Sequence, residues 1–232
     1  MADDFQDTRS VPRGIALLVH DLKAPVARIR AAHDFIAEDH PPPEMVDKAL
    51  AIIDASARAL ERMTHNLLDL DRDDDRLRVA TSPVDVDAMC ATIAAQANAM
   101  AAIVKSGVRV ETALERANAD DRIDRDRMQR AIESLVDDAA RYSGPGGLVR
   151  LETGGDATTL RIAVSDSGPS LTRDQPHEDD TQGARRSHGL GLEFCELVAK
   201  AHGGSLRVET SEAGARIVIE IPQLAPTRDP LP

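Results

Sequence analysis

The chain has 232 residues, of which 42% are hydrophobic, and a formal net charge of −12. This length and apolar content suffice for one large domain or two small ones with a real core, so a disordered chain is not the default expectation. The acidic balance argues against unspecific binding to nucleic acid or to an anionic membrane surface, because both need clustered lysine and arginine.

The first 75 residues show the periodicity of two long helices. The apolar positions alternate in steps of three and four, as along a coiled-coil seam, first at Ile15, Leu18, Leu22, Pro25, Ile29, Ala32 and Ile36, and then at Val46, Ala49, Ile53, Ser56, Leu60, Met63, Leu67 and Leu70. Between the two seams, the triplet Pro41-Pro42-Pro43 ends the first helix, because prolines lack amide donors and restrict the residue before them. A helical hairpin of this kind buries one apolar stripe internally and leaves a second apolar stripe that a partner hairpin must cover. Residues 1–75 therefore predict half of a dimeric four-helix bundle.

A charged linker precedes a second domain, which we expect over residues 84–222. The patterns predict helices over about 87–104, 125–142 and 190–202, and strands over about 108–113, 148–153, 159–165, 205–210 and 216–221. Gly154-Gly155-Asp156 and Glu212-Ala213-Gly214 have the composition of hairpin turns. The fold class is α+β, with helices on one face of a mixed, mostly antiparallel sheet. Residues 169–186 predict a mobile lid, and residues 223–232 a disordered tail.

The two cysteines and the apolar runs indicate in which cellular compartment the protein works. Cys90 and Cys195 lack the paired spacing of a zinc site or a disulfide framework, which favours a reducing compartment. No apolar run approaches the roughly 20 residues of a membrane-spanning helix, and the acidic start is unlike a signal peptide. We expect a cytoplasmic protein without a membrane segment.

His20 is the first candidate for chemistry. With Ile15 at heptad position a, His20 falls at position f, which faces away from the partner helices. The carboxylate of Asp21 can orient the imidazole and hold the proton on one nitrogen, which leaves the other nitrogen free to attack a phosphorus atom. The alternative is an ordinary exposed surface histidine.

Four motifs in order resemble those of bacterial two-component sensor histidine kinases. His20-Asp21-Leu22-Lys23-Ala24-Pro25 looks like the H-box of that family, and residues 134–143 resemble its N-box. Asp166-Ser167-Gly168 is similar to the first glycine box, and residues 187–192 are similar to the second. Each motif alone is weak, but four of them in the right order over residues 10–222 are a strong signal.

The resemblance implies a fold, an activity and partners. It implies a dimerisation and histidine phosphotransfer hairpin followed by an α/β sandwich of the Bergerat ATP-binding type, as in gyrase, Hsp90 and MutL. His20, with Asp21 beside it, is then the catalytic acceptor of the γ-phosphoryl group of ATP, which passes on to an aspartate of a response regulator. The implied partners are a second copy of the chain and the receiver domain of that regulator, with a separate sensor protein as a further candidate.

The resemblance also assigns a nucleotide site. Asp166 would accept a hydrogen bond from the adenine amino group, and Gly168 would let the ring approach the backbone. Amides at the helix start near Gly191 would receive phosphate oxygens. The implied nucleotide-binding residues are Asp138, Arg141, Tyr142, Asp166, Gly168, Arg185, Arg186, Gly189, Leu190 and Gly191, with Asp138 as the ligand of Mg²⁺.

The N-box departs from the family pattern, because Ser134 and Asp138 stand where two asparagines are usual. Aspartate is a good oxygen ligand for Mg²⁺, but without the metal its charge repels a triphosphate. Two alternatives to a kinase stay open. The first is a dimeric histidine phosphotransfer protein with a degenerate domain that does not bind ATP, and the second is an ATP-binding module of the anti-sigma-factor kinase type. The intact second glycine box favours the kinase.

Overall fold

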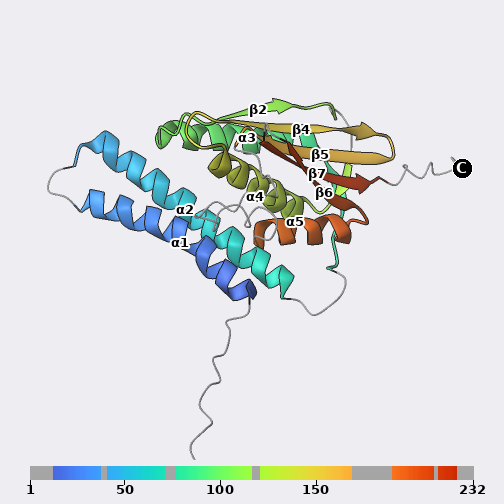
Figure 1. The fold of residues 1–232 in the computed structure, drawn as a ribbon, viewed down its shortest axis with the longest axis horizontal. Helices are drawn as coiled ribbons and strands as arrows, with labels where there is room; N and C mark the ends of the chain where they lie inside the picture. The colour runs from blue at the N-terminus through green and yellow to red at the C-terminus, as the bar shows by residue number, and fades with distance from the viewer. Residues whose placement is uncertain are drawn as a thin grey trace, which may run out of the picture.

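The structure is a computed structural model that describes residues 13–37, 41–71, 77–116, 121–168, 190–211 and 214–223. It consists of a helical hairpin and a two-layer α/β sandwich. Figure 1 shows the hairpin packed along the helix layer of the sandwich, with the sheet on the far side of that layer.

The hairpin consists of α1 (Arg13–Ile36) and α2 (Pro43–Leu70). Pro43 occupies the first turn of α2, where a missing amide costs no intrahelical hydrogen bond. The proline triplet thus separates the helices as predicted. The helix α1 continues through Pro25, which is buried against the hairpin interior. Other buried seam positions are Ala32, Ala49 and Ser56.

The sandwich has three helices over a five-stranded sheet. The helices are α3 (Val86–Ile103), α4 (Arg125–Ser143) and α5 (Leu190–Ala201). The strands, in their order across the sheet, are β2 (Arg109–Ala113), β4 (Leu148–Asp156), β5 (Thr159–Asp166), β7 (Gly214–Pro222) and β6 (Ser205–Ser211). Only the β2–β4 pair in this described sheet is parallel, and the other pairs are antiparallel. The predicted α+β class and the mixed sheet are confirmed.

Two short strands were not predicted from the sequence. Strand β1 (Ser82–Val84) pairs in antiparallel fashion with β3 (Asp121–Ile123) and forms a separate small sheet. Residues 82 and 83 precede the predicted start of the second domain at residue 84, and no strand was predicted at 121–123. A run of three residues is too short to show a period-two pattern, so tertiary packing decides this pair.

The predicted turn at Gly154-Gly155-Asp156 is wrong by two residues. Both glycines pair with β5, Gly154 with Arg161 and Gly155 with Leu160. The turn lies at residues 157 and 158, where the Asp156 carboxylate accepts a hydrogen bond from the Thr158 amide at 2.8 Å. An aspartate that binds the amide two residues later closes the turn. Gly155 is required for another reason, because its φ is +108° and a Cβ there would lie 2.0 Å from the Thr159 carbonyl oxygen. In the other predicted turn, residues 212 and 213 lie outside the described residues.

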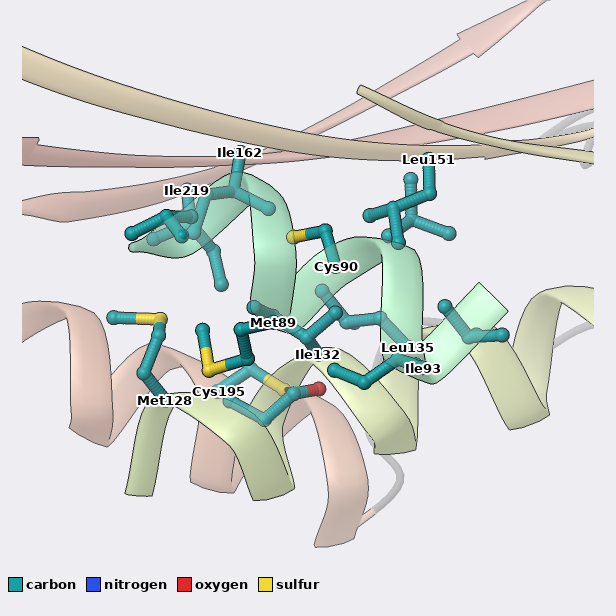
Figure 2. Packing of buried hydrophobic residues seen from close by; sticks show 14 of the residues in the cluster. Met89, Cys90, Ile93, Met128, Ile132, Leu135, Leu151, Ile162, Cys195 and Ile219 are labelled. Carbon is teal, nitrogen blue, oxygen red and sulfur yellow. Dashed lines mark hydrogen bonds between the residues drawn. The ribbon is translucent and has the colours of Figure 1, made fainter. Parts of the chain in front are cut away.

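The main core lies between the helices and the sheet. Figure 2 shows side chains from both layers meeting there, among them Met89, Cys90, Ile93, Met128, Ile132, Leu135, Leu151, Ile162, Cys195 and Ile219. Both cysteines are free and fully buried. Among the described helices, α3 alone is long and apolar enough to be a candidate membrane span, but its buried side forms part of this core.

Candidate functional site

The helix α4 contains the N-box and is held firmly at its start. The Asp124 carboxylate caps the helix by accepting a hydrogen bond from the Arg127 amide at 3.1 Å. The Asp124 amide in turn donates to Nε2 of His202 at 2.9 Å. Because the other ring nitrogen of His202 lies 2.7 Å from the Val198 carbonyl oxygen, the ring is neutral with its proton on Nδ1. Burial lowers the pKa of His202 below its usual 6.5.

One turn after Ser134 on the same face of α4, the Asp138 carboxylate pairs with the Arg141 guanidinium at 3.0 Å. The start of α5 lies against this face. A Cβ on Gly191 would be only 3.3 Å from Oδ2 of Asp138, so glycine allows the close approach of the two helices. The second glycine box and the N-box thus meet at Asp138.

A cavity of about 60 Å³ opens between this face and the hairpin. Its lining residues come from α1, α2, α4 and α5, and they are Asp21, Ala59, Arg62, Met63, Asn66, Ser134, Asp137, Asp138, Arg141, Tyr142, Leu190 and Gly191. Six residues that the resemblance singled out are therefore brought together. They are Asp21, Asp138, Arg141, Tyr142, Leu190 and Gly191. Asp21 is the neighbour of His20 in α1, so the helical turn that contains His20 lies beside residues 134–143 of α4.

The first glycine box lies apart from this cavity. Asp166 ends β5, is half-buried, and accepts a hydrogen bond from the Gly168 amide at 2.9 Å. A Cβ on Gly214 would lie 1.9 Å from the Asp166 carbonyl oxygen, so this end of the sheet also requires glycine. Neither Asp166 nor Gly168 lines the cavity between the hairpin and α4.

Some predicted site residues lie outside what the structure describes. The backbone of His20 is part of α1, but its side chain is outside the described residues, so its predicted heptad direction stays a prediction. Arg185, Arg186 and Gly189, together with the predicted lid at 169–186, also lie outside the described residues.

A row of polar residues on α2 contacts α4 and was not predicted from the sequence. Arg62 pairs with Asp137, and also with Glu133 at 3.4 Å. Asn66 donates a hydrogen bond to the Ser134 hydroxyl at 3.4 Å and accepts one from Arg130 at 2.8 Å. The spacing of Arg62 and Asn66 by four residues was the available signal, because it places both on one helix face.

Asp69 extends the same row toward the end of α2. Its two carboxylate oxygens pair with Arg127 at 3.3 Å and with Arg130 at 2.6 Å, and Asp69 is only 8% exposed. The Arg130 guanidinium also lies 4.8 Å from the centre of the Phe194 ring of α5, within cation–π distance. The hairpin is thus joined to the helix layer by paired charges.

The donor set near Asp138 fits Mg²⁺. The ion is usually held by one or two carboxylates together with substrate phosphates and waters, so one aspartate beside a phosphate-binding helix start suffices. Within the described part of the chain, no cluster of three or more metal-ligating side chains exists. Any metal here would therefore depend on the nucleotide for its remaining ligands.

Two family models match the chain in adjacent stretches. The His Kinase A (phospho-acceptor) domain matches residues 15–76. The histidine kinase-, DNA gyrase B- and HSP90-like ATPase family matches residues 123–225. Together the two models cover more than half of the chain, and they divide it as the hairpin and the sandwich do.

Curated relatives of similar sequence are histidine kinases. Hybrid signal transduction histidine kinase D of Dictyostelium discoideum is 29% identical, over 90% of this chain and 14% of that protein. The probable sensor histidine kinase TcrY of Mycobacterium tuberculosis is 27% identical, over 88% of this chain and 44% of its own length. The adaptive-response sensory kinase SasA of Trichormus variabilis is 23% identical, over 87% of this chain and 54% of its own length. The chain spans about half the length of these bacterial relatives.

Solved structures show the same fold. Histidine kinase AdeS of Acinetobacter baumannii superposes with a TM-score of 0.57 at 18% identity, over 88% of this chain and 98% of that one. Histidine kinase ThkA, in its complex with the response regulator TrrA, gives a TM-score of 0.56 at 20% identity, over 92% of this chain and 62% of that one. Family models, relatives and fold agree: the chain belongs to the two-component sensor histidine kinases, and it contains their phosphoacceptor hairpin and their ATP-binding domain.

Proposed function

We propose that the protein is an ATP-dependent histidine kinase that phosphorylates itself on His20 and passes the phosphoryl group to an aspartate of a response regulator. The observation that supports this most is the cavity in which Asp21 faces Asp138, Arg141 and Gly191. In this cavity the helical turn that contains His20 is next to residues to which the family resemblance assigns phosphate binding, and this supports transfer from ATP to that histidine.

The residues have separable roles in this proposal. Asp166 and Gly168 receive the adenine at the end of β5, while amides at the start of α5 and Arg141 receive the phosphates. Asp138 would hold Mg²⁺, which supplies neutralisation of the phosphate charge when it is bound. Arg185, Arg186 and Gly189 are further phosphate contacts in the proposal.

The transfer itself exchanges one bond for another. An imidazole nitrogen of His20 attacks the γ-phosphorus, the bond from that phosphorus to the bridging oxygen breaks, and ADP leaves. Asp21 orients the imidazole and holds its proton on the other ring nitrogen. In this reaction class the protein contributes mainly positioning and charge neutralisation.

We also propose that the chain works as a homodimer in the cytoplasm, with a response regulator as partner. Large apolar side chains that a partner hairpin could cover are exposed on α1 and α2, among them Val26 at 52%, Leu50 at 52% and Leu68 at 58%. The free state of both cysteines is consistent with a reducing compartment. A separate sensor protein is the proposed source of the input signal.

The test is incubation of the purified protein with γ-labelled ATP and Mg²⁺. We expect acid-labile, base-stable label on the wild type and none on His20→Ala. His33→Ala is the matched control, because His33 is an exposed histidine of the same helix, and it should label like the wild type. A wild-type protein that binds no ATP and takes up no label would support the phosphotransfer alternative instead.

A further inference from the structure

The hairpin and the ATP-binding domain contact each other within one chain, through the polar row on α2. Asn66 is 3% exposed and Asp69 is 8% exposed, and the Arg62 side chain retains 19% of its exposure. Charged and amide groups are seldom buried to this degree without partners, because the loss of their hydration is costly unless hydrogen bonds replace it. All three side chains have their partners on α4.

The partners of Arg62 lie within the N-box or directly before it. Glu133 precedes Ser134, and Asp137 precedes Asp138 in the same helix. Docking of the hairpin and the position of the nucleotide-binding face of α4 are therefore set by one group of contacts. A rotation of α4 that moved Asp138 would also strain the Arg62 ion pairs.

The same docking determines which histidine lies near the cavity. Asp21 lines the cavity together with Asp138 and Gly191, and all three belong to one chain. α1 also contacts α5 directly, at the helix that contains Gly191 (Figure 1). No second copy is needed to bring the turn that contains His20 to the N-box.

We propose that the ion pair between Arg62 and Asp137 docks each ATP-binding domain on the hairpin of its own chain, so that His20 receives its phosphoryl group from the ATP bound by the same chain. The inference rests on the proposed kinase function. In it Arg62 is a positioning residue, because it acts through Asp137 and Glu133 on the placement of α4.

The test is a mixed dimer with one function removed from each chain. One chain has His20→Ala and an intact nucleotide site, and the other has Asp138→Ala and an intact His20. The two chains bear different affinity tags, and tandem purification yields only the mixed species. Transfer within a chain predicts no label on the mixed dimer after incubation with γ-labelled ATP and Mg²⁺.

The controls separate this inference from the proposed function. The wild-type dimer, tagged in the same way, must label, and the Asp138→Ala dimer must not. Label on the chain that keeps His20 in the mixed dimer would overturn the inference and leave the kinase function standing. A wild-type dimer without label would overturn the kinase function, and the inference with it.

A charge exchange tests Arg62 directly. Arg62→Glu and Asp137→Arg should each slow labelling at saturating ATP, and the two together in one chain should restore part of the rate. A mixed dimer of one Arg62→Glu chain and one Asp137→Arg chain should stay slow, because neither chain has a matched pair. Recovery of the rate in that mixed dimer would show docking between chains. Lys48→Glu is the control, because Lys48 pairs with Glu44 of its own helix, one turn away.

Discussion

Asp138 occupies the position with the largest departure from the family pattern. Its carboxylate pairs with Arg141 at 3.0 Å, so part of its charge is neutralised before any nucleotide binds. The proximity of Gly191, whose Cβ would lie 3.3 Å from Oδ2 of Asp138, places this charge at the start of a helix. A helix start favours anions, so the aspartate is tolerated there without a metal.

The first prediction concerns ATP affinity. Asp138→Asn keeps one oxygen ligand and removes a negative charge beside the phosphates, so ATP affinity should be preserved or rise. Asp138→Ala should abolish detectable ATP binding, because it removes the proposed ligand of Mg²⁺. Titration of a fluorescent ATP analogue at millimolar Mg²⁺ measures both.

The dependence on metal is the internal check of this prediction. Binding to the wild type should fall steeply when EDTA removes Mg²⁺, whereas the Asp138→Asn variant should lose less affinity. Equal loss in both proteins would show that Asp138 is not the metal ligand.

At the scale of elements, the start of α4 is a junction of three parts of the fold. Asp124 joins the helix cap to His202 after α5, and it also pairs with Arg127 at 2.7 Å. Arg127 in turn reaches Asp69 of α2. Because Nε2 of His202 accepts a hydrogen bond from the Asp124 amide, protonation of that nitrogen would remove the bond.

The second prediction follows for stability against pH. The pKa of His202 is lower in the folded protein than its unfolded value of about 6.5, so the unfolded state binds the proton more tightly. The contribution that neutral His202 makes to the free energy of unfolding is fully present above about pH 6.5. It is lost as the pH falls through the lowered pKa of the folded state. The urea midpoint should therefore drop between pH 7.5 and pH 5.

Two variants isolate this histidine from the others. His202→Gln should show a smaller drop in midpoint over the same pH range than the wild type, since the titrating group is gone. His33→Gln removes an exposed histidine and should retain the wild-type drop. If both variants respond to pH alike, the titration of His202 does not govern the effect.

The periodicity of the sequence predicted the long elements and could not predict contacts that depend on burial in three dimensions. The apolar seams gave both hairpin helices, and the glycine boxes gave the ends of β5 and the start of α5. Arg62, Asn66 and Asp69 look like a solvated helix face in the sequence, because charged residues are usually exposed. Only the tertiary structure shows that α4 presents opposite charges to this face.

At the scale of the whole molecule, the docking of the two domains depends on buried charge pairs. Asp69 is the central residue, because it pairs with both Arg127 and Arg130. The third prediction is that Asp69→Ala weakens docking by about 3 kcal/mol, the lower end of the range for a broken buried pair. The lower end applies because the side chains of Arg127 and Arg130 are each still 19% exposed to solvent.

Small-angle X-ray scattering measures the expected opening as an increase in the radius of gyration. Circular dichroism should remain that of the wild type, because each domain keeps its own core. Asp54→Ala is the matched control on the same helix, since Asp54 is exposed and pairs with Arg58 one turn away. Exposed pairs of this kind contribute little to stability, so its scattering should not change. An unchanged radius for Asp69→Ala would show that the contact does not hold the domains together.

The two core cysteines make the folded protein nearly inert toward thiol reagents. Burial raises the pKa of the Cys90 thiol to about 12, and it raises that of Cys195 as well, so the reactive thiolate is scarce at neutral pH. The sulfurs lie between α3, α4, α5 and the sheet, where a reagent has access only when the sandwich opens. The two natural cysteines therefore do not interfere with thiol labelling of the native protein. A cysteine introduced on the hairpin surface would be the one reactive thiol of the native state. The slow modification of Cys90 and Cys195 would report the rate at which the ATP-binding domain opens.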